Sequence, residues 1–333
     1  MKMFKQGARL RTLWCGAAAT LLLAACGGGG GQVEPFAPTR IIALGDELSL
    51  ITPTSKKYSV NALVTQTDTT LPDKLDCKTH PIWVQTVATN FGLVFPQCNP
   101  DNVVTTNGLM YAQVGAKVAD VKAQIDAHLA SGSFNPKDLV TVLAGMNDVL
   151  ELYNQFPAQS QGALQALAEQ RGQALAEQVN RIVNANGRSI FVLIPDMGLT
   201  PFALTEKANK PAATGELDRA AFLTSLSARF NSKLRLGVIN DGRLIGLVNG
   251  GEMTQLIVAF PGGYGFANID KPACTVALPD CTTKTLTSTT DTAGTVTKAD
   301  ALTWLWADDT RFGAGMHARL GSTAYQAASI HPF

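Results

Sequence analysis

The chain has 333 residues, of which 46% are hydrophobic, and it carries 27 Lys and Arg against 26 Asp and Glu. This length and apolar content suffice for one large hydrophobic core. The nearly neutral charge excludes the basic footprint of a nucleic-acid-binding protein and a polybasic face for lipid head groups. Nucleic acid is therefore not expected as a partner.

The first 25 residues have the pattern of an export signal. Four Lys and Arg precede an apolar stretch at residues 17–23, which is too short to cross a bilayer as a mature helix. The stretch runs into "LAAC" (23–26), which resembles the lipobox of bacterial lipoproteins, in which the cysteine is acylated and becomes the new N-terminus. We therefore expect residues 1–25 to be a lipoprotein signal peptide. An ordinary cleaved signal with an incidental cysteine is the alternative.

Cys26 is the predicted lipid anchor. The glycine run 27–31 follows it and begins a flexible tether, which we assign to residues 26–39. Three acyl chains would hold such a protein firmly on a membrane. Because Gly27, and not an aspartate, follows Cys26, the resemblance to lipoprotein sorting implies the outer membrane as location and partner.

Beyond the tether, short apolar segments alternate with longer segments of helical periodicity. The apolar segments, rich in Ile, Val and Leu and bounded by Gly, Pro or Asp, are residues 40–46, 138–145 and 189–196. The segments with apolar residues at helical spacing are residues 116–130, 159–185 and 217–238. This β, α, β, α, β order predicts an α/β fold with a central parallel sheet and helices on both faces.

We expect a single domain at residues 40–333. The Thr-rich segment 282–297 has no periodicity and is expected to be an exposed insertion. In doubly wound sheets the active crevice lies beyond the carboxyl ends of the strands. The predicted strands end at Gly45-Asp46, at "GMND" (145–148) and at Pro195-Asp196.

Four further cysteines remain in the mature chain: Cys77, Cys98, Cys274 and Cys281. An even number of cysteines in an exported chain predicts disulfides. Of the three possible connectivities, Cys77–Cys98 with Cys274–Cys281 closes the shortest loops and is the expected one. A zinc site is the alternative, but the sequence has no Cys-x-x-Cys pair and no cluster of histidines to support it. No metal or organic cofactor is predicted.

Four short stretches together resemble the motif blocks of the GDSL, or SGNH, ester hydrolases. They are "ALGDELSL" (43–50), "YAQVGAKV" (111–118), "LAGMNDVL" (143–150) and "WADDTRFGAGMH" (306–317). The flanking "IPDMGLTP" (194–201) and "YGFAN" (264–268) extend the resemblance over nearly all of the chain from Arg40. It is closest to the exported esterases and lipases of that family and implies a three-layer, flavodoxin-like SGNH fold.

The resemblance implies a serine nucleophile after Gly-Asp and a histidine base three residues after a late aspartate. A serine needs such a base, and the tetrahedral oxyanion needs fixed donors. Gly115 and Asn147 match the family's oxyanion-hole donors, and Asp308 matches the aspartate that orients the base. The nucleophile position holds Glu47, however, and the base position holds Arg311.

In the implied fold the nucleophile and base side chains touch, so we expect Glu47 and Arg311 to form an ion pair. Arginine stays protonated and cannot act as a base. Its charge lowers the pKa of a neighbouring carboxylate, which makes that carboxylate a weak proton acceptor. The carboxylate of Glu47 is also expected to accept from Gly115 and Asn147 and so to fill the oxyanion hole. Independent drift of two solvent-facing residues is the alternative.

Other residues could in principle replace the missing groups. Ser49 is two positions after Glu47 and should point away from it. His317 is interpreted as a structural histidine, with a role as base as the alternative. The remaining histidines, His80, His128 and His331, have no motif around them and are expected at the surface. Aromatic residues near the last block could line a ligand cleft or belong to the core, namely Trp304, Trp306 and Phe312.

Two functions follow from these observations. The first is an SGNH homologue with a dismantled triad, which acts as a binding or structural lipoprotein of the envelope, with an ester, lipid or glycan as possible ligand. The second is an active carboxylic ester hydrolase with a non-standard catalytic constellation, since oxyanion donors alone can leave residual catalysis.

Overall fold

The computed structural model describes residues 35–68, 70–290 and 296–329. The predicted signal peptide, the Cys26 anchor, most of the tether and His331 lie outside these ranges. The chain divides after Glu34 into two compact units, and the second unit, Pro35–Phe333, contains everything described below. Within the described ranges, no helix combines the length and apolarity needed to span a membrane.

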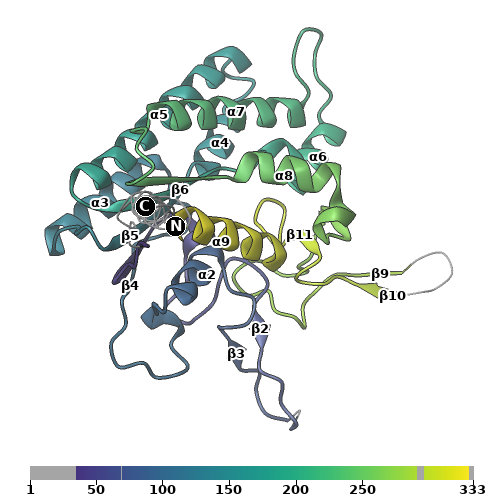
Figure 1. The fold of residues 1–333 in the computed structure, drawn as a ribbon. Coiled ribbons are helices and arrows are strands. Elements are labelled where there is room, and N and C mark those ends of the chain that lie inside the picture. The colour runs from purple at the N-terminus through teal and green to yellow at the C-terminus, as the bar shows by residue number, and fades with distance from the viewer. Residues whose placement is uncertain (1–34, 69, 291–295, 330–333) are drawn as a thin grey trace, which may run out of the picture. The chain divides into compact units, whose positions relative to one another are not determined.

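A five-stranded parallel sheet forms the centre of the fold (Figure 1). In spatial order its strands are β4 (Gly108–Met110), β1 (Arg40–Gly45), β5 (Asp138–Leu143), β6 (Arg188–Leu193) and β7 (Ile245–Asn249). Every residue of β5 is buried, as expected for a strand that is covered on both faces. The three predicted strands are β1, β5 and β6, with boundaries within three residues of the prediction.

Helices cover both faces of the sheet, which makes the three-layer α/β fold that the sequence predicts. In Figure 1, α3 (Val118–Ser131), α4 (Met146–Tyr153), α5 (Gln161–Asn184) and α7 (Arg219–Gly237) lie above the sheet. Below it, α2 (Trp83–Asn90) packs on α9 (Ala314–Ser329). The other two helices are α6 (Pro201–Asn209) and α8 (Gly250–Ala259).

Local sequence determines where the long helices begin and how closely they pack. Ser160 accepts a hydrogen bond from the backbone N–H of Ala163 and caps α5, and Asp218 caps α7 in the same way. A Cβ atom on Gly172 of α5 would lie 2.2 Å from the backbone oxygen of Phe230 in α7. Glycine is therefore required for α5 and α7 to approach this closely.

A second, smaller hydrophobic core is formed mainly by residues of the carboxyl-terminal part of the chain. It contains Val60, Ala273, Cys281, Ala299 and Trp304 among other buried residues. The described residues also form three short strand pairs: β8 (Asn268–Pro272) with β11 (Trp304–Trp306), β9 (Ser288–Thr290) with β10 (Val296–Lys298), and β2 (Ala62–Leu63) with β3 (Leu75–Asp76). The Thr-rich segment thus contributes to the antiparallel pair β9–β10, which was not predicted and in which the residues of β10 are exposed.

Two disulfides join Cys77 to Cys98 and Cys274 to Cys281. This is the local connectivity expected from the sequence. The zinc alternative is wrong, because all four sulfur atoms are used in these bonds. Two disulfides are typical of a protein in an exported, oxidising compartment.

Candidate active site

The turn after β1 places Glu47 at the carboxyl edge of the sheet. Gly45 has φ +123°, and a Cβ atom there would lie 1.9 Å from the backbone oxygen of Leu143, so only glycine fits. The side chain of Gln124 bonds to both the N–H and the C=O of Gly45 and fixes this strand end. Asp46 then caps the 3₁₀ helix η2 (Glu47–Ser49) by accepting from the N–H of Leu48.

The carboxylate of Glu47 is buried, with 3% of the residue exposed, and accepts three hydrogen bonds. Its Oε1 accepts from Nε of Arg311 at 2.8 Å and forms an ion pair with Nη2 of the same residue at 2.6 Å. Its Oε2 accepts from the backbone N–H of Gly115 at 2.8 Å and from Nδ2 of Asn147 at 3.1 Å. The predicted ion pair is confirmed, and the alternative of two independent solvent-facing residues is wrong.

Asp308 fixes the other half of the pair. Its Oδ1 accepts from the backbone N–H groups of Thr310 and Arg311, at 2.9 and 2.6 Å. Its Oδ2 accepts from Nη1 of Arg311 at 2.9 Å. The guanidinium therefore lies between two carboxylates, those of Asp308 and Glu47, in the places where an SGNH hydrolase would have aspartate, base and nucleophile.

Protonation in this site opposes acid–base catalysis. Burial raises the pKa of Glu47, but the charge of Arg311 and the hydrogen bonds from Gly115 and Arg311 outweigh it, so that pKa lies below its ordinary value. Burial lowers the pKa of Arg311, but the charges of Asp308 and Glu47 raise it by more, so that pKa lies above its ordinary value. At neutral pH Glu47 is therefore an anion of low proton affinity, which makes it a weak base, and Arg311 is a cation that cannot remove a proton.

Asp46 has the opposite environment. Burial and the adjacent charge of Glu47 raise the pKa of Asp46 well above its ordinary value. Its Oδ2 is buried and has no hydrogen-bond partner among the described residues. The substitution at position 47 therefore favours a neutral Asp46 beside an ionised Glu47.

The two oxyanion-hole positions are held together by a residue that the sequence did not single out. Asn147 is the second residue of α4, and its neighbour Asp148 accepts from the backbone N–H of Val118 at 3.0 Å. Arg171 of α5 donates to the other oxygen of Asp148 at 3.2 Å. Asp148 thus fixes α4 to the loop that carries Gly115. The sequence signal that could have identified Asp148 is its position directly after Asn147.

Ser49 and His317, which could in principle replace the missing nucleophile and base, make hydrogen bonds to Trp83 instead. The hydroxyl of Ser49 is fully buried and accepts from Nε1 of Trp83 at 3.1 Å. His317 is fully buried in α9, and its Nδ1 accepts from the backbone N–H of Trp83 at 3.4 Å. The structural interpretation of His317 therefore holds. The expectation that His128 is a surface residue is wrong, because it is buried against Tyr111 and Phe134.

The aromatic residues near the last block belong to the core. Trp306 and Phe312 stack with ring centroids 5.4 Å apart, and at most 1% of either residue is exposed. Trp304 is also buried, in the second core. The alternative that these three side chains line a ligand cleft is therefore wrong.

His317 should make the protein sensitive to acid. Burial and the charge of Lys57 lower the pKa of His317 to about 3, whereas the unfolded chain binds a proton near 6.5. The stability provided by the neutral ring is present above the unfolded pKa and is lost as pH falls toward the folded one, by up to about 1.4 kcal/mol per pH unit. His317→Asn should flatten this slope in urea unfolding measured from neutral to acidic pH. Equal slopes in the two proteins would contradict the assignment.

The fold and site define an α/β protein with an ion pair between Glu47 and Arg311 at the carboxyl end of β1. The chain belongs to the GDSL-like lipase/acylhydrolase family, whose model matches residues 67–291, more than half of its length. The matched range includes Gly115 and Asn147 and excludes Glu47 and Arg311. No curated protein gave a significant match.

Three solved structures that are similar to this chain have low sequence identity to it. A member of the lipolytic G-D-S-L family from Veillonella parvula DSM 2008 is 11% identical, with 86% of this chain and 96% of that chain covered and a TM-score of 0.42. A catalytic mutant of an acetylxylan esterase from Geobacillus stearothermophilus is 12% identical, with 87% and 93% covered and a TM-score of 0.42. The lipase/acylhydrolase from Enterococcus faecalis is 10% identical, with 86% and 93% covered and a TM-score of 0.35.

A metal site is not apparent in this part of the molecule. Across residues 35–68, 70–290 and 296–329, no group of three or more His, Cys, Asp or Glu side chains is placed to hold a metal ion.

Proposed function

We propose that this family member has a catalytically silent site and acts as a binding or structural protein of the bacterial envelope. The observation that carries the proposal is the carboxylate of Glu47, which is ion-paired to Arg311 and bonded to both oxyanion-hole donors. The site is closed by the protein's own side chain.

Each catalytic requirement is blocked by this arrangement. Glu47 stands where a hydroxyl nucleophile is needed, and Arg311 cannot remove a proton. The donors of Gly115 and Asn147 are already bonded to an anion, so a substrate oxyanion would have to displace it. Loss of a single triad member costs several orders of magnitude in rate, and here two are absent.

Family membership supports the second candidate, an ester hydrolase with a non-standard constellation. In that case Glu47 would be the nucleophile. Its three hydrogen bonds, its ion pair with Arg311 and its lowered pKa oppose this role, because they stabilise the carboxylate in its resting state.

The two candidates differ in a direct measurement. Purified mature protein should hydrolyse short-chain aryl esters no faster than Glu47→Ala, which lacks the carboxylate. Turnover at ordinary enzyme rates, roughly 1 s⁻¹ or more, that disappears in Glu47→Ala would establish Glu47 as a catalytic residue and exclude the silent-site proposal.

For location, we propose a lipoprotein of the outer membrane, with a signal peptide at 1–25, a tether at 26–39 and one hydrolase-like domain at 40–333. The "LAAC" motif and the glycine run support this assignment, and the two disulfides agree with export. Labelled palmitate should be incorporated by the parent but not by Cys26→Ser. Equal labelling of both proteins would exclude Cys26 as the anchor.

A further inference from the structure

A buried lysine lies close to the Glu47 site without belonging to it. Lys57 has no exposed surface, and its Nζ donates to the backbone oxygens of Cys77, Thr79 and His80 at 3.2, 2.9 and 2.7 Å. Burial lowers the pKa of Lys57 to about 8, which leaves it an ammonium at neutral pH. Its three N–H donors thus match three acceptors.

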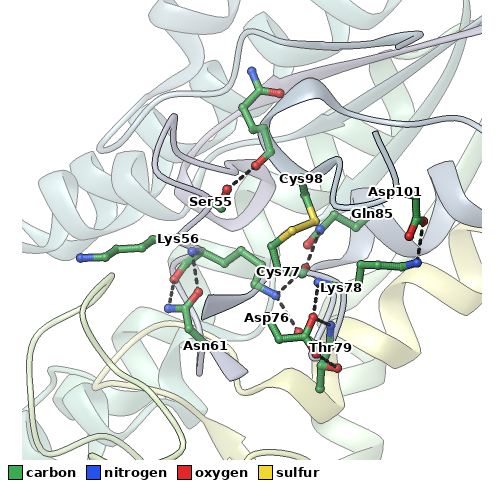
Figure 2. Close-up of a disulfide and its surroundings, with 12 residues drawn as sticks. Ser55, Lys56, Asn61, Asp76, Cys77, Lys78, Thr79, Gln85, Cys98 and Asp101 are labelled. Atoms are coloured by element: carbon green, nitrogen blue, oxygen red, sulfur yellow. Dashed lines mark hydrogen bonds and ion pairs between the residues drawn. A yellow bond between two sulfur atoms is a disulfide. The ribbon is translucent and has the colours of Figure 1, made fainter. Parts of the chain in front are cut away.

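The loop that supplies these acceptors is itself fixed. Figure 2 shows the Cys77–Cys98 disulfide that closes it and Gln85, whose Nε2 donates to the backbone oxygen of Cys77 at 3.1 Å. Asp76, in the same view, accepts from the backbone N–H groups of Lys78 and Thr79. Lys57 is therefore anchored on a rigid partner.

Asn61 joins the other end of the segment to the second disulfide loop. Its Oδ1 accepts from the N–H of Lys57 at 2.9 Å, and its Nδ2 donates to the backbone oxygen of Lys57 at 3.0 Å. The same amide donates to the backbone oxygens of Pro279 and Cys281, at 2.9 and 3.0 Å. Residues 57–61 are thus held from both sides, by the 77–98 loop and by the 274–281 loop.

Ser59, in the middle of this segment, contacts the loop of the ion pair. Its buried hydroxyl donates to the backbone oxygen of Phe312, the residue after Arg311, at 2.9 Å. The bonds from Asp308 lie within the loop and move with it, so they do not fix it relative to β1. The bond from Ser59 does, because Lys57 pairs with Ile51, two residues after η2, and residues 57–61 are held by two disulfide loops.

We infer that residues 57–61 form a positioning clamp, in which Lys57, Ser59 and Asn61 hold the Arg311 loop where the guanidinium reaches Glu47. A long arginine side chain loses rotamer entropy when it is fixed, so its bond to Glu47 depends on a preset backbone. The inference deepens the silent-site proposal, since the clamp is what keeps the site closed.

Hydrogen exchange of the Nε–H of Arg311, observed by NMR, tests the clamp. That proton bonds to Glu47 and is exposed to solvent when the pair opens. We expect exchange to be roughly fivefold faster in Ser59→Ala, which loses one hydrogen bond, and more than tenfold faster in Lys57→Met, which loses the three hydrogen bonds of the ammonium. Amide protons of β6 are the internal reference, because a general loss of stability would accelerate both.

Lys56→Met is the matched control. Lys56 is adjacent in sequence, but its Nζ makes an exposed ion pair with Asp280, and it points away from the disulfide in Figure 2. Lys56→Met should leave the exchange of the Arg311 Nε–H unchanged.

If Lys57→Met does not fold, Ser59→Ala decides whether residues 57–61 act as a clamp. Parent-like exchange in Ser59→Ala, or equal acceleration of the β6 amides, would overturn the clamp. Neither result depends on whether the parent hydrolyses esters, so the silent-site proposal is tested separately.

Discussion

Replacing Glu47 by serine and Arg311 by histidine together should turn the protein into an ester hydrolase, with a rate roughly 10³-fold or more above that of the parent. The double substitution restores a nucleophile and a base and frees the oxyanion hole at once. Asp308 already holds position 311 through two backbone hydrogen bonds, and Gly115 and Asn147 already converge on position 47. The measurement is hydrolysis of short-chain aryl esters by the purified proteins.

The single variants show why both changes are needed. Glu47→Ser alone provides a nucleophile, but Arg311 beside it cannot act as its base. Arg311→His alone provides a base, but the carboxylate of Glu47 still occupies the oxyanion hole. Both single variants should therefore hydrolyse esters at nearly the parent rate. Asn147→Ala in the double variant is the control, since it should remove most of the gain by deleting an oxyanion donor. A folded double variant that stays at the parent rate would show that the remaining groups are not in working geometry.

Glu47→Ala should destabilise the folded protein by about 3 kcal/mol, because it removes one of the two carboxylates that pair with the guanidinium of Arg311 and takes the acceptor from the N–H of Gly115 and the amide of Asn147. The pKa of Glu47 lies below its ordinary value of 4.5 in the folded state. Its contribution to stability is therefore present above the unfolded pKa and is lost as pH falls through the folded one. Urea unfolding of both proteins at neutral and acidic pH measures this difference.

Formate should restore part of the lost stability in Glu47→Ala, since a small carboxylate fits the donors that Glu47 vacates, and a ligand that binds only the folded state stabilises it. Asp280→Ala is the control, because it breaks an exposed ion pair with Lys56 and should cost less than about 1 kcal/mol. A loss in Glu47→Ala as small as this control would show that the buried pair is not a stabilising contact.

The sequence predicts the inner strands of the sheet better than its edge strands. The strands β1, β5 and β6 are mostly apolar beyond their first residues, because helices cover both of their faces. The strands at the two edges escaped prediction, since β4 has three residues and β7 contains Gly246 and an exposed Leu247. Short edge strands have neither the length nor the continuous apolar pattern on which the prediction depends.

At the site, the sequence predicts those contacts that follow from the resemblance to a known family. The pairing of Glu47 with Arg311 follows from two aligned motif positions of opposite charge. The clamp could not be predicted in this way, because its contacts join Lys57, Ser59 and Asn61 to backbone oxygens of distant loops. A backbone acceptor has no sequence signature, so such contacts appear only when the chain is folded.

The ion pair also constrains the order in which the molecule is completed. Glu47 and Arg311 are 264 positions apart, so the carboxylate is synthesised long before its partner. A chain that ends before Arg311 has an unpaired charge at the end of β1, which disfavours burial of that edge of the sheet. Contacts of such long range slow folding. We therefore expect the core around Glu47 to be completed only after Arg311 has been synthesised.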